Sequence, residues 1–500
     1  MENLNALKTR LNEVHYLQMV LALLEWDQQV MMPPGGDEHR AAQIATVSRL
    51  HHELFTAEET GRLLEAAEQE AADLPYDSDD ASLLRVARHD YDLATRVPAS
   101  LVAEIARVTA LAHNEWARAR ANNDFAAFKP RLKQIFDLKR QEAEALGYTD
   151  HIYDALLDQF EPGMKTAEIT RLFEELKAAQ IPMIRAIAAQ QDRVDNAVLR
   201  REYDEARQEQ LSREVAAQLG YNFTNGRLDR AVHPFSTSFG SRDVRITTRY
   251  ERTWLPAALF GTIHEAGHAM YEQGSAESIS GTMLEGGTSL GVHESQSRLW
   301  ENLVGRSREF WTHYFPRLKA LFPETLADTD LETFYRAVNR VAPSLIRVEA
   351  DEVTYNMHVI IRFELEKALL EGSLSIDDAP EAWNARYEEY LGVRPPNDTL
   401  GILQDVHWSS GLIGYFPTYT LGNLMSVPFF NCALKDHPDI PAQIARGEFG
   451  TLLGWLQEHI YAHGRKYMPG ELFQRVTGET MTAAPYLDYL RTKYGELYDL

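Results

Sequence analysis

The chain has 500 residues, of which 44% are hydrophobic, a length and composition typical of a folded protein with one large core or two or three smaller domains. Its 50 lysines and arginines face 74 acidic residues, and the formal charge of -24 at pH 7 repels nucleic-acid backbones and anionic membranes. The single cysteine, Cys432, excludes an internal disulfide and a thiolate metal site, and it favours a reducing cytoplasm.

We expect neither a signal peptide nor a membrane-spanning helix. The N-terminus lacks a basic start followed by an unbroken apolar stretch, and polar residues interrupt every apolar run well short of the roughly 20 residues that cross a bilayer. Together with the negative charge, this pattern predicts a cytoplasmic protein that binds neither membranes nor nucleic acid.

Helical periodicity dominates the chain. Apolar residues recur at three- and four-residue steps from Leu4 to Leu24, which predicts an amphipathic N-terminal helix. The same spacing follows Thr166, whose hydroxyl can cap a helix start, and Thr329 with Glu332 forms a capping box before a third such segment. The sequence therefore predicts a mainly α protein.

One segment, residues 233–250, departs from this pattern. It combines aromatic and β-branched residues with an alternating face that includes Val244, Ile246 and Thr248, on one side of a Gly-Ser-Arg-Asp turn. We predict a small hairpin or a three-stranded sheet. An edge strand there could hold an extended peptide through main-chain hydrogen bonds.

The chain is predicted to form one domain over residues 1–500. The loops at 73–82 and 281–292 are too short to separate independent domains, and no repeat of fixed period is present.

The strongest chemical signal is the pentapeptide HEAGH at 264–268. On a helix, His264 and His268 project from the same face one turn apart and can grip one zinc ion, with Glu265 beside them as general base. The pentapeptide alone is also compatible with two solvated histidines on a helix surface.

A catalytic zinc ion needs a third protein ligand and one open position. Glu294 begins a helical segment after a glycine-rich loop, so a second rigid element could deliver it, and His293 is its nearest rival. Spacing alone leaves five candidates: Glu272, Glu277, Glu285, His293 and Glu294.

The segments HEAGH (264–268) and HESQS (293–297) resemble the carboxypeptidase Taq family of zinc metallocarboxypeptidases. EWDQQVMMP near the N-terminus is also similar to that family. Further segments resemble its other signature blocks in the same order: HPF (233–235), DVRIT (243–247), IRVEAD (346–351) and GILQDVHW (401–408). The similarity spans nearly the whole chain.

This resemblance implies an all-helical fold related to angiotensin-converting enzyme and neurolysin, with a deep groove between two helical halves and usually a homodimer. It implies release of single residues from peptides with a free C-terminus. It also implies that Glu294 is the third ligand of one zinc ion per chain, and that cobalt can substitute for zinc.

In such an enzyme Glu265 accepts a proton from the attacking water and passes it to the leaving amine. The oxyanion needs a hydrogen-bond donor in addition to zinc. We expect His407 or Tyr415 in this role, with Tyr419 as a third candidate.

Removal of C-terminal residues requires a cation that binds the substrate carboxylate, and the planar fork of arginine suits it. Arg347 is the first candidate, with Arg245 and His233 as others. Asp351, four residues after Arg347 on the same expected helix, could orient it or form an ordinary surface ion pair.

Two other functions use the same residues. A zinc endopeptidase would have the same ligands and a groove open at both ends, and a non-catalytic helical scaffold would hold the metal only for stability. Internal cleavage products would indicate the first, and absence of metal-dependent activity the second.

Overall fold

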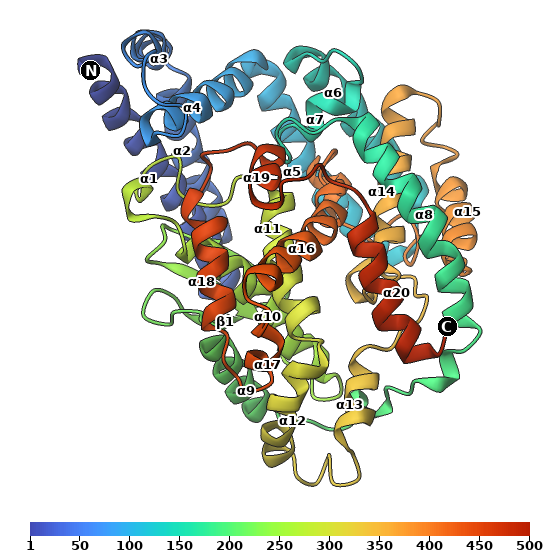
Figure 1. Ribbon diagram of the computed structural model, residues 1–500. Coiled ribbons are helices and arrows are strands. Elements are labelled where there is room, and N and C mark those ends of the chain that lie inside the picture. Colours follow the sequence, from blue (N-terminus) through green and yellow to red (C-terminus); the bar gives the residue numbers. More distant parts are fainter. The chain divides into compact units, whose positions relative to one another are not determined.

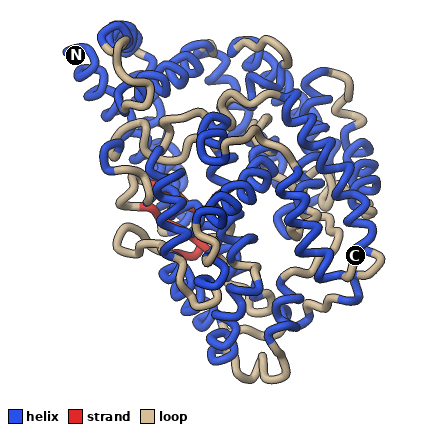
Figure 2. Tube along the Cα trace, viewed as in Figure 1, coloured by secondary structure: helices blue, strands red, loops and turns tan.

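The computed structural model describes residues 1–500 and is mainly helical, as predicted, with one small sheet (Figures 1 and 2). The chain divides into two compact units, each assembled from three separate segments. Unit 1 comprises residues 1–95, 196–338 and 426–479, and unit 2 comprises 96–195, 339–425 and 480–500. That residues 1–500 act as one domain stays a prediction.

The helices of unit 1 lie in all three of its segments. They are α1 (Glu2–Val30), α2 (Asp37–Thr56), α3 (Glu58–Glu70), α4 (Asp79–Arg96), α9 (Glu205–Leu219), α10 (Leu255–Gln273), α11 (Leu290–Arg298), α12 (Arg308–Leu321), α13 (Leu331–Val338), α17 (Ile440–Ile444), α18 (Gly450–His459) and α19 (Pro469–Thr477).

Unit 2 is also mainly helical. They are α5 (Ala99–Asn122), α6 (Phe125–Leu146), α7 (Ile152–Leu157), α8 (Thr166–Ala188), α14 (Tyr355–Glu371), α15 (Ala379–Leu391) and α20 (Ala484–Tyr498). The residues of α16 (Pro417–Asp436) are divided between the two units.

The N-terminal helix has the predicted apolar stripe. Leu4, Leu7, Leu11 and Val14 are buried and pack with side chains of α2, α3 and α4 in one apolar cluster. Removing such side chains from water stabilises this part of unit 1 by roughly 1.5–3 kcal/mol each.

Two predicted helix starts are right in position but wrong in the capping residue. Helix α8 begins at Thr166, yet Asp154 of α7 accepts the hydrogen bonds of the Thr166 amide at 2.7 Å and of its hydroxyl at 2.5 Å. At α13 the cap is Asp330, which accepts from the Thr333 amide at 2.8 Å. A carboxylate is at least as good a cap as a hydroxyl. At both helix starts an aspartate therefore accepts the amide hydrogen bond that the prediction assigned to a threonine hydroxyl.

The predicted sheet has three strands in the order β1-β3-β2: β1 (Leu228–Arg230), β2 (Ser236–Ser238) and β3 (Val244–Thr248). β2 and β3 are antiparallel, with Ser236 opposite Ile246, whereas β1 runs parallel to β3 and lies entirely before the predicted segment 233–250. Gly240, with φ of 117°, makes the turn between β2 and β3 possible. β2 is thus an edge strand.

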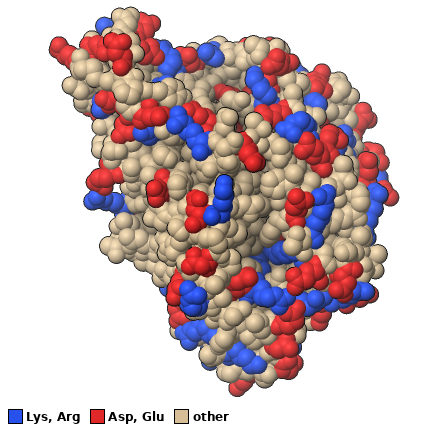
Figure 3. Space-filling model, in the orientation of Figure 1, with Lys and Arg blue, Asp and Glu red and all other residues tan.

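Acidic and basic side chains are mixed over the face drawn in Figure 3. Many form ion pairs within one unit, such as that of Arg465 with Asp90 at 2.9 Å. None of the helices combines the length and the hydropathy that a bilayer crossing requires.

Candidate metal and catalytic centre

Helix α10 carries the histidine pair. Pro256 lies in its first turn, where a missing amide hydrogen costs nothing, and Leu259, Ile263 and Met270 are buried on its inner side. α10 packs against α11, α9 and β3. The amphipathic pattern of this helix therefore fixes where His264 and His268 point.

Helix α11 carries Glu294 and approaches α10 unusually closely. Ser289 caps α11 by accepting the Val292 amide at 3.0 Å. At the crossing, a Cβ on Gly267 would lie 2.7 Å from Cα of Ser297 and 2.9 Å from the carbonyl oxygen of Gln296. The glycine of HEAGH thus lets the two backbones touch and brings Glu294 to the histidines.

We expect Gly267→Ala to lower the free energy of unfolding by about 1–3 kcal/mol, because the methyl group must push α11 away. Gly261→Ala is the matched control on the same helix, since its Cβ would meet only ordinary contacts at 3.6 and 3.8 Å. Denaturant unfolding measures both. Equal destabilisation by the two variants would contradict the close crossing.

Three donor atoms from these helices converge. Oε2 of Glu294 lies 3.6 Å from Nε2 of His264 and 3.5 Å from Nε2 of His268, and the ligand atoms of the three residues all lie within 4.8 Å of one another. Tetrahedral zinc with bonds of about 2.0–2.2 Å holds its ligand atoms roughly 3.3 Å apart. The donor set and its spacing both fit that ion.

A carboxylate behind His264 fixes its tautomer. Oε2 of Glu301 lies 2.9 Å from Nδ1 of His264, and Glu301 is itself paired with Arg298 at 3.2 Å and Arg306 at 3.1 Å. Glu301 lies in a π-helical turn, Leu299–Val304. Because Nδ1–H donates to Glu301, the lone pair of Nε2 faces the other donors.

A second chain of hydrogen bonds begins at Nδ1 of His268. Its Nδ1 lies 2.8 Å from Nδ1 of His293, whose Nε2 lies 2.5 Å from Oε1 of Glu272. His293 therefore has both ring nitrogens engaged away from the donor cluster. The two remaining acids also lie elsewhere, since Glu277 pairs with Arg242 and Glu285 accepts from the Ser241 amide.

The side chain of Glu265 is buried, and its carboxyl makes no hydrogen bond or ion pair with the rest of the protein. Burial raises the pKa of its carboxyl to about 7. Its oxygens are therefore available to a ligand.

The other two candidates of unit 1 are placed differently. Arg245 on β3 forms two hydrogen bonds of 2.8 Å with Asp243 and stacks 4.3 Å from the ring of Trp26. His233 is exposed in the loop between β1 and β2.

In unit 2 four candidates lie together. Arg347 is buried and stacks 4.9 Å from the ring of Tyr419, and Nε2 of His407 lies 3.4 Å from the Tyr419 hydroxyl. The ring of Tyr415 lies 5.4 Å from that of His407. Glu366 on α14 holds the segment 407–415, which carries His407 and Tyr415.

Glu366 accepts hydrogen bonds from both sides of the segment. The Trp408 indole donates at 2.7 Å and the Gly414 amide at 3.1 Å, and the hydroxyl of Tyr153 adds a third bond at 2.7 Å. The positions of His407 and Tyr415, which flank these donors in sequence, are thereby tied to α14.

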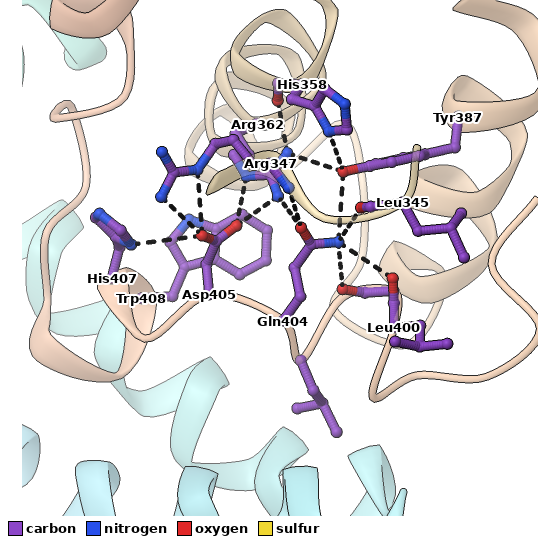
Figure 4. A network of polar contacts seen from close by, with 12 residues as sticks. Leu345, Arg347, His358, Arg362, Tyr387, Leu400, Gln404, Asp405, His407 and Trp408 are labelled. Carbon is purple, nitrogen blue, oxygen red and sulfur yellow. Dashed lines mark hydrogen bonds and ion pairs between the residues drawn. The ribbon is translucent and has the colours of Figure 1, made fainter. Parts of the chain in front are cut away.

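The predicted partnership of Arg347 with Asp351 is wrong. Residues 347–349 form a 3-10 turn, and α14 begins only at Tyr355, so the two residues do not share a helix. Asp351 instead accepts from the amides of Ala342, Val353 and Thr354, each at 3.0 Å. Arg347 pairs with Asp405, at 3.0 Å, in the polar network of Figure 4.

A family model described as carboxypeptidase Taq (M32) metallopeptidase matches residues 6–494. The chain belongs to this family. The thermostable carboxypeptidase 1 of Thermus thermophilus is 45% identical over 97% of each chain, and carboxypeptidase 1 of Bacillus subtilis is 39% identical over 97% of this chain and 96% of that protein.

Solved structures agree. The M32 carboxypeptidase of Deinococcus radiodurans is 44% identical with a TM-score of 0.97 over 100% of each chain, and a Pyrococcus furiosus carboxypeptidase is 37% identical with a TM-score of 0.96 over 99% of each. The protein is a metallocarboxypeptidase that hydrolyses the C-terminal peptide bond of peptides. The predicted activity is confirmed, and neither the endopeptidase nor the scaffold is favoured.

Sequence reasoning missed the residues that support the candidates of this M32 carboxypeptidase. Glu301 and Asp405 carried no predicted role, and Glu272 was considered only as a ligand. Asp405 and Gln404 lie in a quoted signature block, GILQDVHW, which was the one available signal. Glu301 had none, because the π-helical turn that places it is not visible in a 3.6-residue period.

Proposed function

We propose that this carboxypeptidase holds one zinc ion per chain through His264, His268 and Glu294. The convergence of their three donor atoms supports the assignment. The hydrogen bonds of Nδ1 support it further: His264 donates to Glu301 and His268 to His293. Metal-bound imidazoles characteristically donate their other N–H in this way. Two imidazoles and a carboxylate are a donor set of catalytic zinc, in which a fourth position stays open.

Glu265 is proposed as the general base. When bound, zinc supplies Lewis acidity and lowers the pKa of a water molecule to about 7. The Glu265 carboxylate accepts the proton of the attacking water and delivers it to the leaving amine. The burial of its carboxylate without a protein partner supports this role, because no protein group competes with water for its oxygens.

Arg347 is proposed to bind the terminal carboxylate of the peptide. It is only 4% exposed, and burial makes its charge-assisted hydrogen bonds stronger than those of a surface arginine. Arg245 and His233 are proposed as secondary substrate contacts. His407 and Tyr415, with Tyr419 beside them, are proposed as the donors that stabilise the oxyanion.

A homodimer in the cytoplasm is also proposed. It rests on the family resemblance and on the single cysteine, which suits a reducing compartment. Sedimentation of the purified protein at micromolar concentration tests the dimer, and a monomer there would contradict it.

Removal of the metal should abolish peptide hydrolysis. After chelation and dialysis, we expect zinc at about one equivalent per chain to restore activity and cobalt to restore it as well. Magnesium, which prefers six oxygen ligands, should not. Metal analysis and kcat/KM are measured on the same samples. Full activity in metal-free protein, or restoration by magnesium alone, would contradict the zinc proposal.

A further inference from the structure

One carboxylate in unit 2 is shared by two buried arginines (Figure 4). Oδ1 of Asp405 accepts from Nε and Nη2 of Arg347 at 3.2 and 3.0 Å. Oδ2 of the same side chain lies 2.6 and 2.5 Å from Nε and Nη2 of Arg362. Because each oxygen meets two nitrogens on one edge of a guanidinium, Asp405 fixes the plane of both groups.

The two arginines differ in how many of their five N–H donors the protein uses. Arg362 is fully engaged: Nε and Nη2 contact Asp405, Nη2 also donates to Gln404 at 2.8 Å, and Nη1 donates to the His358 carbonyl at 2.6 Å and the Tyr387 hydroxyl at 3.1 Å. It is 0% exposed and anchors the network.

Arg347, in contrast, has N–H donors that the protein does not use. Besides its two bonds to Asp405, its side chain makes one hydrogen bond, from Nη1 to the hydroxyl of Tyr355 at 3.0 Å. This leaves one N–H on each terminal nitrogen, the pair with which an arginine grips a carboxylate through two parallel bonds. The backbone amide of Arg347 is held as well, by Gln404 at 3.1 Å.

The charges of the network do not balance. The two guanidinium groups carry two positive charges and Asp405 carries one negative charge, which leaves one positive charge. The other side chains that are hydrogen-bonded to the two arginines, Tyr355, Tyr387 and Gln404, are neutral. Burial and then Arg347 lower the pKa of the nearby His407 imidazole to about 3, and Glu366, the next carboxyl to interact with Arg362, has its pKa raised to about 7 by burial. A buried excess charge of one is costly unless a ligand of opposite sign compensates it.

We propose that Asp405 is a positioning residue of this carboxypeptidase, which presents Arg347 to the terminal carboxylate of the substrate, and that Arg362 holds Asp405 in turn. This inference rests on the proposed role of Arg347. Without Asp405 the long Arg347 side chain would lose its fixed plane, and a displacement of 1 Å in a positioning group can cost on the order of 100-fold in rate.

A purely structural network would contain the same bonds, so the test must report on the carboxylate itself. The probe is a peptide whose scissile amide is replaced by a CH2–NH bond, made with a free C-terminus and with a C-terminal amide. The ratio of the two inhibition constants, amide over acid, measures recognition of the terminal charge independently of turnover.

In the wild-type enzyme we expect this ratio to be on the order of 100 or more. Asp405→Asn should lower it at least about tenfold, and Arg347→Gln should bring it close to one. In the Arg347→Gln background, Asp405→Asn should change the ratio no further, because the aspartate acts through the arginine. Asp405→Glu keeps the charge but moves it by one methylene group, and it should give an intermediate ratio.

Thermal unfolding and zinc content are recorded for every variant. If Asp405→Asn does not fold, Asp405→Glu decides, and an unchanged ratio in it overturns the proposal. An unchanged ratio in folded Asp405→Asn, or an equal further loss in the double variant, also overturns it and leaves Arg347 as the recognition residue. A wild-type ratio in Arg347→Gln would instead overturn the proposed role of Arg347 itself.

Discussion

Glu265→Gln is expected to abolish peptide hydrolysis while zinc stays bound. The amide of glutamine has the shape of the carboxylate but cannot accept the proton of the attacking water, and general-base catalysis is typically worth about 100- to 10,000-fold. Glu265 is not one of the three donors, and these are held by other neighbours: Glu301 for His264, His293 for His268 and Arg298 for Glu294. We therefore expect kcat to fall at least about 1,000-fold with an unchanged zinc content.

Glu277→Gln is the matched control for this substitution. Glu277 follows the same helix but is exposed and pairs with Arg242 at the surface, so its replacement should leave kcat and metal content unchanged. Loss of zinc from Glu265→Gln would show that Glu265 contributes to metal binding and would count against the assignment.

Glu294→Ala is expected to lose metal and activity together. Its carboxylate is the only anionic donor of the three, and it reaches the histidines from a second helix. We expect the affinity for zinc to fall by more than the roughly 10- to 100-fold that loss of a supporting residue costs. Titration with zinc against a competing chelator measures it.

His293→Gln provides the comparison, because it removes a residue that supports His268 without removing a ligand. Its zinc affinity should lie between those of the wild type and Glu294→Ala. If Glu294→Ala bound zinc normally while His293→Gln did not, His293 would be the third ligand and the placement of α11 would have to be revised.

Sequence spacing was sufficient for the histidine pair because it depends on one helix. A separation of four residues places His264 and His268 on one face whatever surrounds α10. The third donor depends on a tertiary contact, the crossing at Gly267, and five candidates remained until the family pattern favoured Glu294. The sheet was predicted from alternation in β3, whereas β1 is too short to carry such a pattern.

The network around Arg347 was beyond sequence reasoning for a different reason. A charged residue such as Arg362, in a helix that carries several other charged residues, is usually interpreted as a solvated position, yet here it is fully buried. Its burial is possible only because Asp405, 43 residues away, supplies the opposite charge. Asp351 was predicted as the partner because an intervening helix was assumed, and the 3-10 turn at 347–349 removes that geometry.

Mass spectrometry of a peptide ladder tests the central claim most directly, with free and C-terminally amidated peptides incubated with the zinc-loaded and the chelated enzyme. We predict stepwise loss of single residues from free C-termini alone, absent after chelation and restored by zinc, and absent in Glu265→Gln at full zinc content. Internal fragments, or cleavage of amidated peptides at a similar rate, would contradict it.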